Sequence, residues 1–275
     1  MTAAAMLVEA HAFWGFAERQ FNLVKRYWAW EIVWVVYSLV SVLSIGYLGQ
    51  GLSSGSAGLD VGRTRLYLLV GALLWTYLSL VFVEISLAIT WERWEGTIEY
   101  TFMAPVKRVT HLLGICLFAL LYGLIRAAFV TLVTVLLFQL DLSRADFLAA
   151  GMLLLASILP LIGLGILTAV LPLLSPEKGE QMAIAVQGVI LLVSGVYYPL
   201  TVLPPPLRAL GEVSPLTYTL AGVRESLLNG AHVGDQLATV GVLLLMGGLL
   251  VPAGLTLFGW AERRAKRLGL LKRSG

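Results

Sequence analysis

The chain has 275 residues, of which 59% are apolar and only 13% are charged, and its mean hydropathy is +0.87. Soluble domains are nearer half apolar and one quarter charged, so this composition excludes a water-soluble fold for most of the chain and indicates a membrane protein. The single cysteine, Cys116, excludes an internal disulfide and a cysteine-based metal site. The net charge of +3 is informative only through the positions of the charged residues along the chain.

Residues 1–27 are predicted to form an amphipathic helix that lies in the membrane interface before the first span. Apolar residues recur there at helical spacing on one stripe, and charged residues fall off it. A solvated helix without lipid contact is the alternative. Glu9 and Glu18 interrupt the start, so the segment does not have the pattern of a cleaved signal peptide. The stripe consists of Leu7, Ala10, Trp14, Ala17, Phe21, Val24 and Trp28.

Six apolar stretches are predicted to cross the bilayer. A spanning helix needs about 20 apolar residues, because each residue adds about 1.5 Å and the hydrocarbon core is about 30 Å thick. The fifth stretch is short and the third is long, which favours tilting or partial exposure. The six stretches are residues 28–49, 66–90, 110–139, 146–172, 181–198 and 235–259.

The predicted fold is therefore an all-α integral membrane protein with six transmembrane helices. It is divided into the N-terminal helix at 1–27, one six-span domain at 28–260 and a basic tail at 261–275. If the N-terminus is cytosolic, 13 Lys and Arg residues fall on the inner side and 5 on the outer side, with Arg126 left inside a span. Cytoplasmic segments carry the excess of Lys and Arg, so both termini are predicted to face the cytosol.

The segment 91–105, between the second and third predicted spans, carries an unusual charge pattern. On one continuous helix its acidic residues gather on a stripe, beside an aromatic and apolar face that suits the membrane interface. Like charges repel, so a cytosolic acidic ridge is better explained by a partner that meets it; a merely solvated turn is the alternative. The ridge consists of Glu92, Glu95 and Glu99, and the apolar face of Trp91, Trp94, Ile98 and Phe102.

This segment resembles the turn between the second and third spans of ABC-2 type permeases, the membrane subunits of bacterial exporters of drugs, nodulation factors and polysaccharides. Residues 92–99, Glu-Arg-Trp-Glu-Gly-Thr-Ile-Glu, followed by Pro105, are similar to the family form E-R-E-x-G-T-x-E followed by P. Trp94 stands where the family often has an acidic residue. The family's helix docks into the ATP-binding subunit, so the resemblance implies a coupling role for Glu92, Arg93, Glu95, Gly96, Thr97, Glu99 and Pro105.

A second resemblance lies between the fifth and sixth predicted spans. Residues 194–200, Ser-Gly-Val-Tyr-Tyr-Pro-Leu, lead through three prolines at 204–206 to residues 214–217, Ser-Pro-Leu-Thr. This is similar to the family segment that re-enters the outer leaflet as short helices. The separated prolines cannot sit in one continuous helix, and residues 207–228 carry charges, so a re-entrant helical segment is predicted there.

The energy source for transport is expected on another polypeptide, because the chain lacks the Gly-x-x-x-x-Gly-Lys-Ser/Thr loop that cradles nucleotide phosphates. No cofactor is expected on this chain; ATP and Mg are expected on the partner. The resemblance implies export by alternating access in the cell inner membrane. The expected partners are an ABC ATP-binding subunit, a second copy of this permease and membrane lipids, with no nucleic acid.

Two charged residues, Glu84 and Arg126, fall inside predicted spans, where each costs about 2.5–3.5 kcal/mol at the bilayer centre. Their different depths argue against a direct pair, and Arg126 is expected to meet Glu225 or Glu212 instead. Glu84, Arg126 and Glu225 are therefore candidates for a gate or cargo path, with structural pairing or snorkelling as the other interpretation.

Two other function classes fit the sequence less well. A membrane enzyme needs a nucleophile–base pair, clustered aspartates or His-Glu-x-x-His, and the sequence offers none of these patterns. An ion-coupled secondary transporter is the alternative to the exporter, but it usually pairs charges near the midplane of broken helices. The cargo, of the drug, lipid or glycan class, is not specified by six apolar spans.

Overall fold

The computed structural model describes residues 3–54, 61–140 and 142–271. Every regular element in these ranges is helical, which confirms the all-α prediction. Five helices are long and apolar enough to cross a bilayer, which confirms a protein with several membrane spans. They are α2 (Trp28–Ser54), α3 (Val61–Ser86), α6 (Arg108–Phe138), α7 (Phe147–Leu174) and α11 (Val233–Arg267).

The predicted fifth span, residues 181–198, is shorter in the structure. Helix α8 (Gly179–Val193) has 15 residues and is about 22 Å long, less than the hydrocarbon thickness of a bilayer. It ends there because Gly195 has a φ of 69°, in the left-handed region that favours glycine, and because Pro199 follows. The count of six full-length spans is therefore not confirmed.

The remaining helices are short or lie beside the bundle. Pro205 and Pro215 occupy the first turn of α9 and α10, where proline costs a helix no hydrogen bond. The prolines thus divide this stretch into separate short helices, as predicted. These remaining elements are α1 (Ala3–Arg26), α4 (Ala88–Trp94), α5 (Ile98–Met103), the 3₁₀ turn η1 (Leu200–Val202), α9 (Pro205–Glu212) and α10 (Pro215–Leu228).

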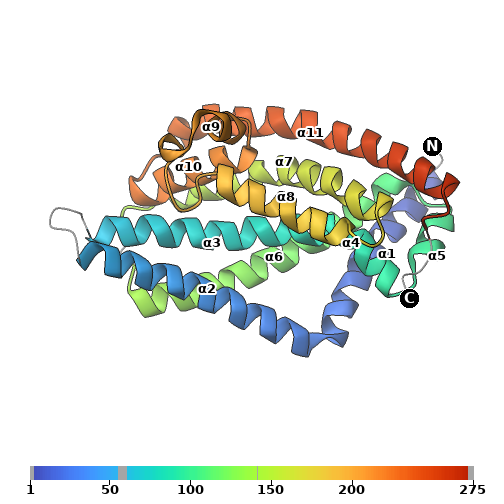
Figure 1. Ribbon diagram of the computed structural model, residues 1–275, viewed down its shortest axis with the longest axis horizontal. Helices are drawn as coiled ribbons and strands as arrows, with labels where there is room; N and C mark the ends of the chain where they lie inside the picture. Colours follow the sequence, from blue (N-terminus) through green and yellow to red (C-terminus); the bar gives the residue numbers. More distant parts are fainter. Residues whose placement is uncertain (1–2, 55–60, 141, 272–275) are drawn as a thin grey trace.

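The long helices connect two ends of an elongated molecule (Figure 1). Helices α4 and α5 lie at one end, together with the last turns of α11, whereas α9 and α10 lie toward the other. An ion pair of 3.1 Å between Arg108 and Glu262 joins the start of α6 to the end of α11 at the α4–α5 end. Residues 261–267, expected to begin a separate basic tail, continue α11 without a break.

Helix α7 is the centre of the bundle and packs most extensively against α11. Small residues allow this close approach: a Cβ added to Gly163 would lie 2.6 Å from Leu250, and one added to Gly247 would lie 2.5 Å from Leu159. Close contact between helix backbones is a general means of association in membranes, where burial of apolar surface gives no advantage over lipid.

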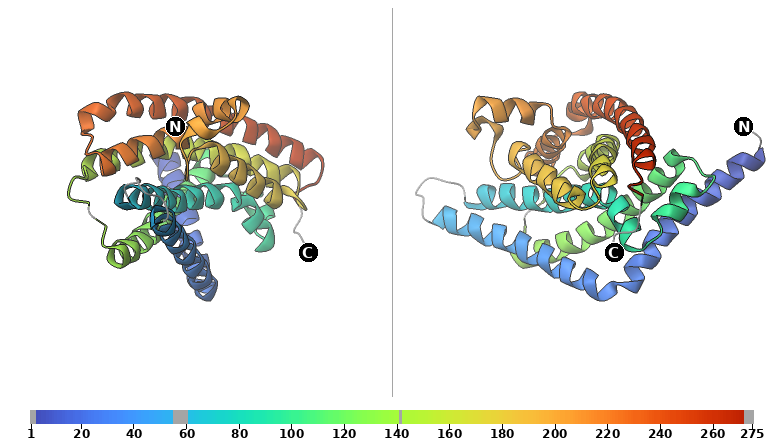
Figure 2. Two further views of the ribbon diagram at one scale, coloured as in Figure 1. Left: turned by 60° about the vertical axis from the view of Figure 1, so that its left-hand side comes forward. Right: turned by 45° about the vertical axis from the view of Figure 1, so that its right-hand side comes forward.

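Helix α2 has a different environment from α7. Only 17% of its most apolar window is buried, compared with 67% for α7, so most of its side chains are left for lipid or another chain. Figure 2 shows α1 and α2 meeting at an open angle on the side of the molecule away from α11.

Helix α1 packs on α6 with a side that the predicted stripe only partly matches. Ala17 of the stripe is buried, but Leu7 and Trp14 are 61% and 59% exposed. The backbone approaches α6 at Gly114, where an added Cβ would lie 2.7 Å from the Phe13 carbonyl oxygen. The exposed part of the stripe is the part still available to a membrane interface.

Candidate functional site

The segment 91–105 is not the single helix that the sequence suggested. Helix α4 ends at Trp94 because Gly96 has a φ of 71°. The Thr97 amide donates to the Glu92 carbonyl (2.9 Å), and the Gly96 amide donates to the Arg93 carbonyl (3.1 Å). This pair of bonds is a Schellman motif, a standard helix C-terminus built on a left-handed glycine. Helix α5 then begins in a new direction at Ile98.

The break corrects the two predicted faces. Ile98 and Phe102, assigned to the membrane interface, are 0% and 4% exposed within the bundle. Glu92 is 0% exposed, whereas Glu99 is on the surface. The three glutamates therefore do not form one cytosolic ridge, because the spacing rule for a continuous helix does not hold across Gly96.

Glu92 joins three helices instead of facing a partner. Its Oε1 accepts from Arg19 Nη1 of α1 (3.1 Å) and lies 2.7 Å from His111 Nε2 of α6. The Phe16 and Phe102 rings flank the His111 ring at centroid distances of 4.7 and 6.3 Å. A fully buried carboxylate is stable only when cationic or hydrogen-bonding partners compensate for the loss of water, as Arg19 and His111 do here.

The electrostatics of Glu92 follow from these contacts. Burial by itself raises the pKa of the Glu92 carboxyl, but His111 and Arg19 outweigh it through charge and hydrogen bonding, and the net pKa lies below the ordinary value. The carboxylate is therefore ionised at neutral pH. It fixes the positions of α1 and α6 relative to α4.

Arg93 is also inside the protein, at 2% exposure. Its Nη2 donates to the carbonyl of Leu173, one residue before the end of α7 (3.0 Å). Carbonyls in the last turn of a helix have no partner within the helix, so Arg93 acts as a cap that holds α7 to α4. A direct contact between this side chain and another protein is not possible in this arrangement.

Glu95 and Thr97 connect the turn to α1 and its junction with α2. Glu95 Oε1 accepts from the Tyr27 hydroxyl (2.9 Å), and Oε2 lies 3.7 Å from Arg26. The Thr97 hydroxyl accepts from Arg19 Nη2 (2.6 Å). The predicted motif is thus largely occupied by contacts within this chain.

Arg108 makes the corresponding connection at the other end of α5. Its Nη1 and Nη2 donate to the carbonyls of Thr101 and Phe102 (2.9 and 3.1 Å), which caps α5. Its Nε donates to Glu262 of α11 (3.1 Å). A displacement of α5 would therefore be transmitted directly to the ends of α6 and α11.

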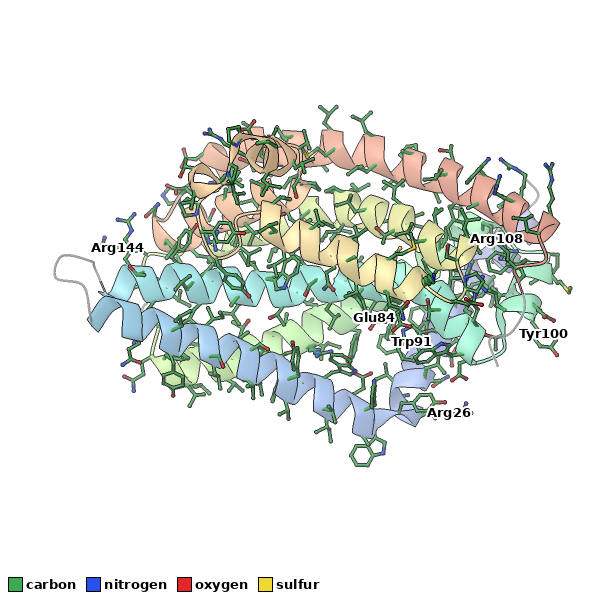
Figure 3. All side chains as sticks on the ribbon, viewed as in Figure 1. Arg26, Glu84, Trp91, Tyr100, Arg108 and Arg144 are labelled. Carbon is green, nitrogen blue, oxygen red and sulfur yellow. The ribbon has the colours of Figure 1, made fainter. Side chains whose placement is uncertain are left out.

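The part of the motif that faces outward is the tip of α5 and the turn around it, which we call the α5 face. Tyr100 and Met103 are 79% and 81% exposed. Figure 3 shows Tyr100 pointing away from the bundle at the end of the molecule. Glu99 has no hydrogen-bond or ion-pair partner among the described residues. The α5 face consists of Trp94, Glu99, Tyr100, Met103 and Pro105.

Arg126 and Glu84 belong to a separate polar cluster within the long helices. Arg126 donates to the Trp34 carbonyl and to the Ser38 hydroxyl of α2. Glu84 interacts through charge with Arg126 and with Glu31, which in turn accepts from the Tyr122 hydroxyl. The cluster joins α2, α3 and α6, so half-buried charges that looked isolated in the sequence have partners on three helices.

The expected contact between Arg126 and Glu225 is wrong. Glu225 is exposed on α10 and accepts from Asn229 Nδ2 (2.7 Å), and the other expected acid, Glu212, pairs with Arg208 (3.0 Å). Arg126 reaches α2 because the two helices cross near its position. No three His, Cys, Asp or Glu side chains within the described ranges are arranged to hold a metal ion.

Sequence reasoning missed most of the residues that hold this site together. Arg19, His111, Arg108 and Glu262 come from helices far apart in the chain, and no local spacing connects them. The signal available for Tyr100 and Met103 was indirect: the Gly96 that ends α4 turns the next residues outward.

Comparison with known proteins places this end of the chain within a described family. The sequence profile described as "ABC-2 type transporter" matches residues 11–228, which include α4, α5 and both re-entrant candidates α9 and α10. The chain belongs to the ABC-2 type transporter family. Together with the five long apolar helices, this membership shows a multi-pass membrane protein of the transporter class.

One characterised relative within the ABC-2 family is the linearmycin resistance permease protein LnrN of Bacillus subtilis (strain 168). It is 32% identical over 100 residues. The matched segment covers 36% of this chain and 25% of LnrN, so it extends over only a quarter of the relative's length. This similarity supports the family assignment and leaves the cargo open.

Proposed function

We propose that this chain is the membrane-spanning permease subunit of an ATP-driven exporter and that a separate ABC ATP-binding subunit docks on the α5 face. The observation that carries the proposal is the exposure of Tyr100 and Met103 beside Glu99 at the tip of an otherwise anchored turn. Exposed aromatic side chains surrounded by polar residues are typical of protein interfaces. ATP and Mg bind to the partner and not to this chain.

Movement of the docked subunit is transmitted through two sets of ion pairs. Glu92 links α4 to α1 and α6, and Arg108 links α5 to α6 and α11. In this scheme the turn is shaped and held by Glu92, Arg93, Gly96 and Thr97. Glu95 connects the turn to Tyr27. The contact surface for the partner includes Glu99 and Pro105. The coupling residues of the family motif thus divide into braces and contacts.

Six crossings and a re-entrant segment are part of this proposal. The carbonyl of Val196, just beyond α8, lies against Gly71, ten residues after the start of α3 and about 15 Å along it. The chain then turns back through η1 and α9. This return of the chain within the bundle supports α8 as a partial span and α9–α10 as re-entrant helices. In the proposed topology the protein lies in the inner membrane, and the α5 face and both termini face the cytosol.

The proposed cargo is hydrophobic or amphiphilic, of the drug, lipid or glycan class, and it moves outward by alternating access. A second copy of the permease completes the pathway. The weakly buried α2, with 17% of its apolar window inside the bundle, supplies the apolar surface for that copy and for lipid.

The docking proposal is tested by co-purifying the permease with its ATP-binding subunit and measuring ATP hydrolysis and export in liposomes. Replacing Tyr100 by Ala is expected to weaken association at least about tenfold, the loss typical of an aromatic anchor at an interface. Glu99→Lys is expected to leave membrane insertion intact and to uncouple hydrolysis from export. Normal export by both variants would overturn the proposal.

A matched control is available at the opposite end. Glu212→Lys makes the same charge reversal on exposed α9, far from α5, and is expected to leave association unchanged. Glu95→Lys is also expected to uncouple, but with reduced thermal stability, because it removes the acceptor of Tyr27 and faces Arg26.

A further inference from the structure

A pocket of about 420 Å³ lies where α10 meets α3 and the end of α8, away from the α5 face. Figure 1 places these three elements together toward the end of the molecule that carries α9. Its wall combines polar and apolar side chains. Those used below are Arg63, Tyr67, Arg224, Leu200 and Leu220.

Arg224 is the central cation of this pocket and is only 7% exposed. Its Nη1 donates to the carbonyl of Gly195 (2.8 Å), and its Nη2 donates to the carbonyl of Val196. The guanidinium lies over the Tyr67 ring, 3.9 Å from the centroid. The side chain also fits against the backbone of Gly71, where any Cβ would meet the guanidinium.

The acceptors around Arg224 are neutral. No carboxylate oxygen of the described residues lies within the 4.0 Å ion-pair distance of its nitrogens, and its Nε–H has no hydrogen-bond partner there. A guanidinium remains protonated in proteins, and burying its charge without a counter-ion is costly. The fold therefore keeps one uncompensated positive charge in the pocket wall.

A second cation stands at the pocket rim. Arg63 Nη2 donates to Asn229 Oδ1 (3.0 Å), and Asn229 Nδ2 donates to Glu225 Oε2 (2.7 Å). The acidic side chain of this wall, Glu225, is exposed and is bonded to Asn229 and not to Arg224. Among the lining residues that the structure describes, there are two guanidinium groups and one carboxylate.

We propose that this pocket binds the anionic headgroup of an amphiphile. A phosphate or carboxylate group would be held by Arg224 and Arg63, since guanidinium groups match the geometry of these oxyanions. Leu200 and Leu220 supply apolar wall for the attached chain. The inference goes beyond the exporter function, because binding here requires neither the ATP-binding subunit nor any direction of transport.

The test uses the purified full-length permease in detergent and counts bound lipid by native mass spectrometry. Phosphatidylglycerol is expected to bind in preference to phosphatidylcholine. Arg63→Gln is expected to reduce phosphatidylglycerol binding about fivefold, the effect of one cation near an anionic headgroup, and Arg224→Gln by at least as much. Arg208→Gln removes an exposed cation from α9 outside the pocket wall and is expected to change nothing.

Two further measurements keep the outcome decisive. Because Arg224 also holds the end of α8, its variant can lose the fold; Arg63 is exposed, so Arg63→Gln tests the pocket without that complication. Displacement of phosphatidylglycerol by inorganic phosphate supports a free oxyanion as the ligand, and failure to displace it supports the lipid headgroup. Equal binding of both lipids, or full phosphatidylglycerol binding by Arg63→Gln, would overturn the proposal.

Discussion

Glu92 and Glu99 stand seven positions apart in one acidic motif, yet the fold gives them opposite environments. Glu92 is enclosed by Arg19 and His111, whereas Glu99 lies on the surface. The difference arises from the left-handed Gly96 between them, which redirects the chain. A motif can therefore combine a structural acid with a contact acid, and the two respond differently to substitution.

Replacing Glu92 with Gln should lower the stability of the permease by about 2 kcal/mol, because a buried charge-assisted bond to Arg19 and His111 is lost. The measurement is thermal unfolding of purified protein in detergent. Glu99→Gln is the matched control and should unfold at the wild-type temperature. Equal unfolding temperatures for the Glu92 and Glu99 variants would show that the three-helix joint contributes nothing.

The same joint predicts a pH dependence. The pKa of Glu92 is lower in the folded protein than its ordinary value of 4.5. The contribution of Glu92 to the free energy of unfolding is therefore complete above pH 4.5 and is lost as the pH falls through the lower pKa of the folded protein. The gap in unfolding temperature between wild type and Glu92→Gln should therefore close on acidification from pH 7 to below 4.5. A gap that stayed constant would argue against an ionised Glu92.

Arg126 offers a second residue-level prediction. Arg126→Leu removes the bonds to the Trp34 carbonyl and Ser38, and it leaves Glu84 without its neighbouring cation while the like charge of Glu31 remains. We expect a lower unfolding temperature than for Arg144→Leu, which changes an exposed loop residue. An unchanged protein would mean that Arg126 only extends toward the headgroups.

At the level of elements, helix positions followed from the sequence more readily than helix ends. Apolar length alone located α2, α3, α6, α7 and α11, because the bilayer requires long apolar stretches. The break at Gly96 was missed, and the break at Gly195 was placed several residues too late. Glycine is tolerated within membrane helices, and its φ depends on the surrounding packing. The contacts of Arg19, Arg108 and His111 depend on that packing as well.

The α7–α11 contact gives a prediction with an internal control. Gly247→Leu places a side chain against Leu159 and Pro160, whereas the neighbouring Gly248 has open space around it. Overpacking usually costs about 1–3 kcal/mol, so Gly247→Leu should lower the unfolding temperature and Gly248→Leu should not. Similar behaviour of the two variants would contradict the close packing of these helices.

For the whole molecule, the clearest prediction concerns topology. Cys116 is buried and is the single cysteine of the chain, so replacing it with Ala provides a background for labelling. A cysteine introduced at the exposed Met103 should react with a membrane-impermeant reagent only from the cytosolic side. One introduced at Arg144, at the far end of the molecule in Figure 3, should react only from the outside. Labelling of Met103→Cys from the outside would remove the basis for ATPase docking.

The short α8 has a consequence for the membrane itself. Its surface includes Ile184 and Val189, which are 50% and 51% exposed, but the helix covers only about 22 Å. Beyond the buried turn at Gly195, the exposed residues Pro199 and Thr201 take the place of helix at the protein surface. We expect the acyl chains beside this segment to shorten or bend, which would thin one leaflet locally. Such a dimple would make the permease sensitive to the chain length of the lipids around it.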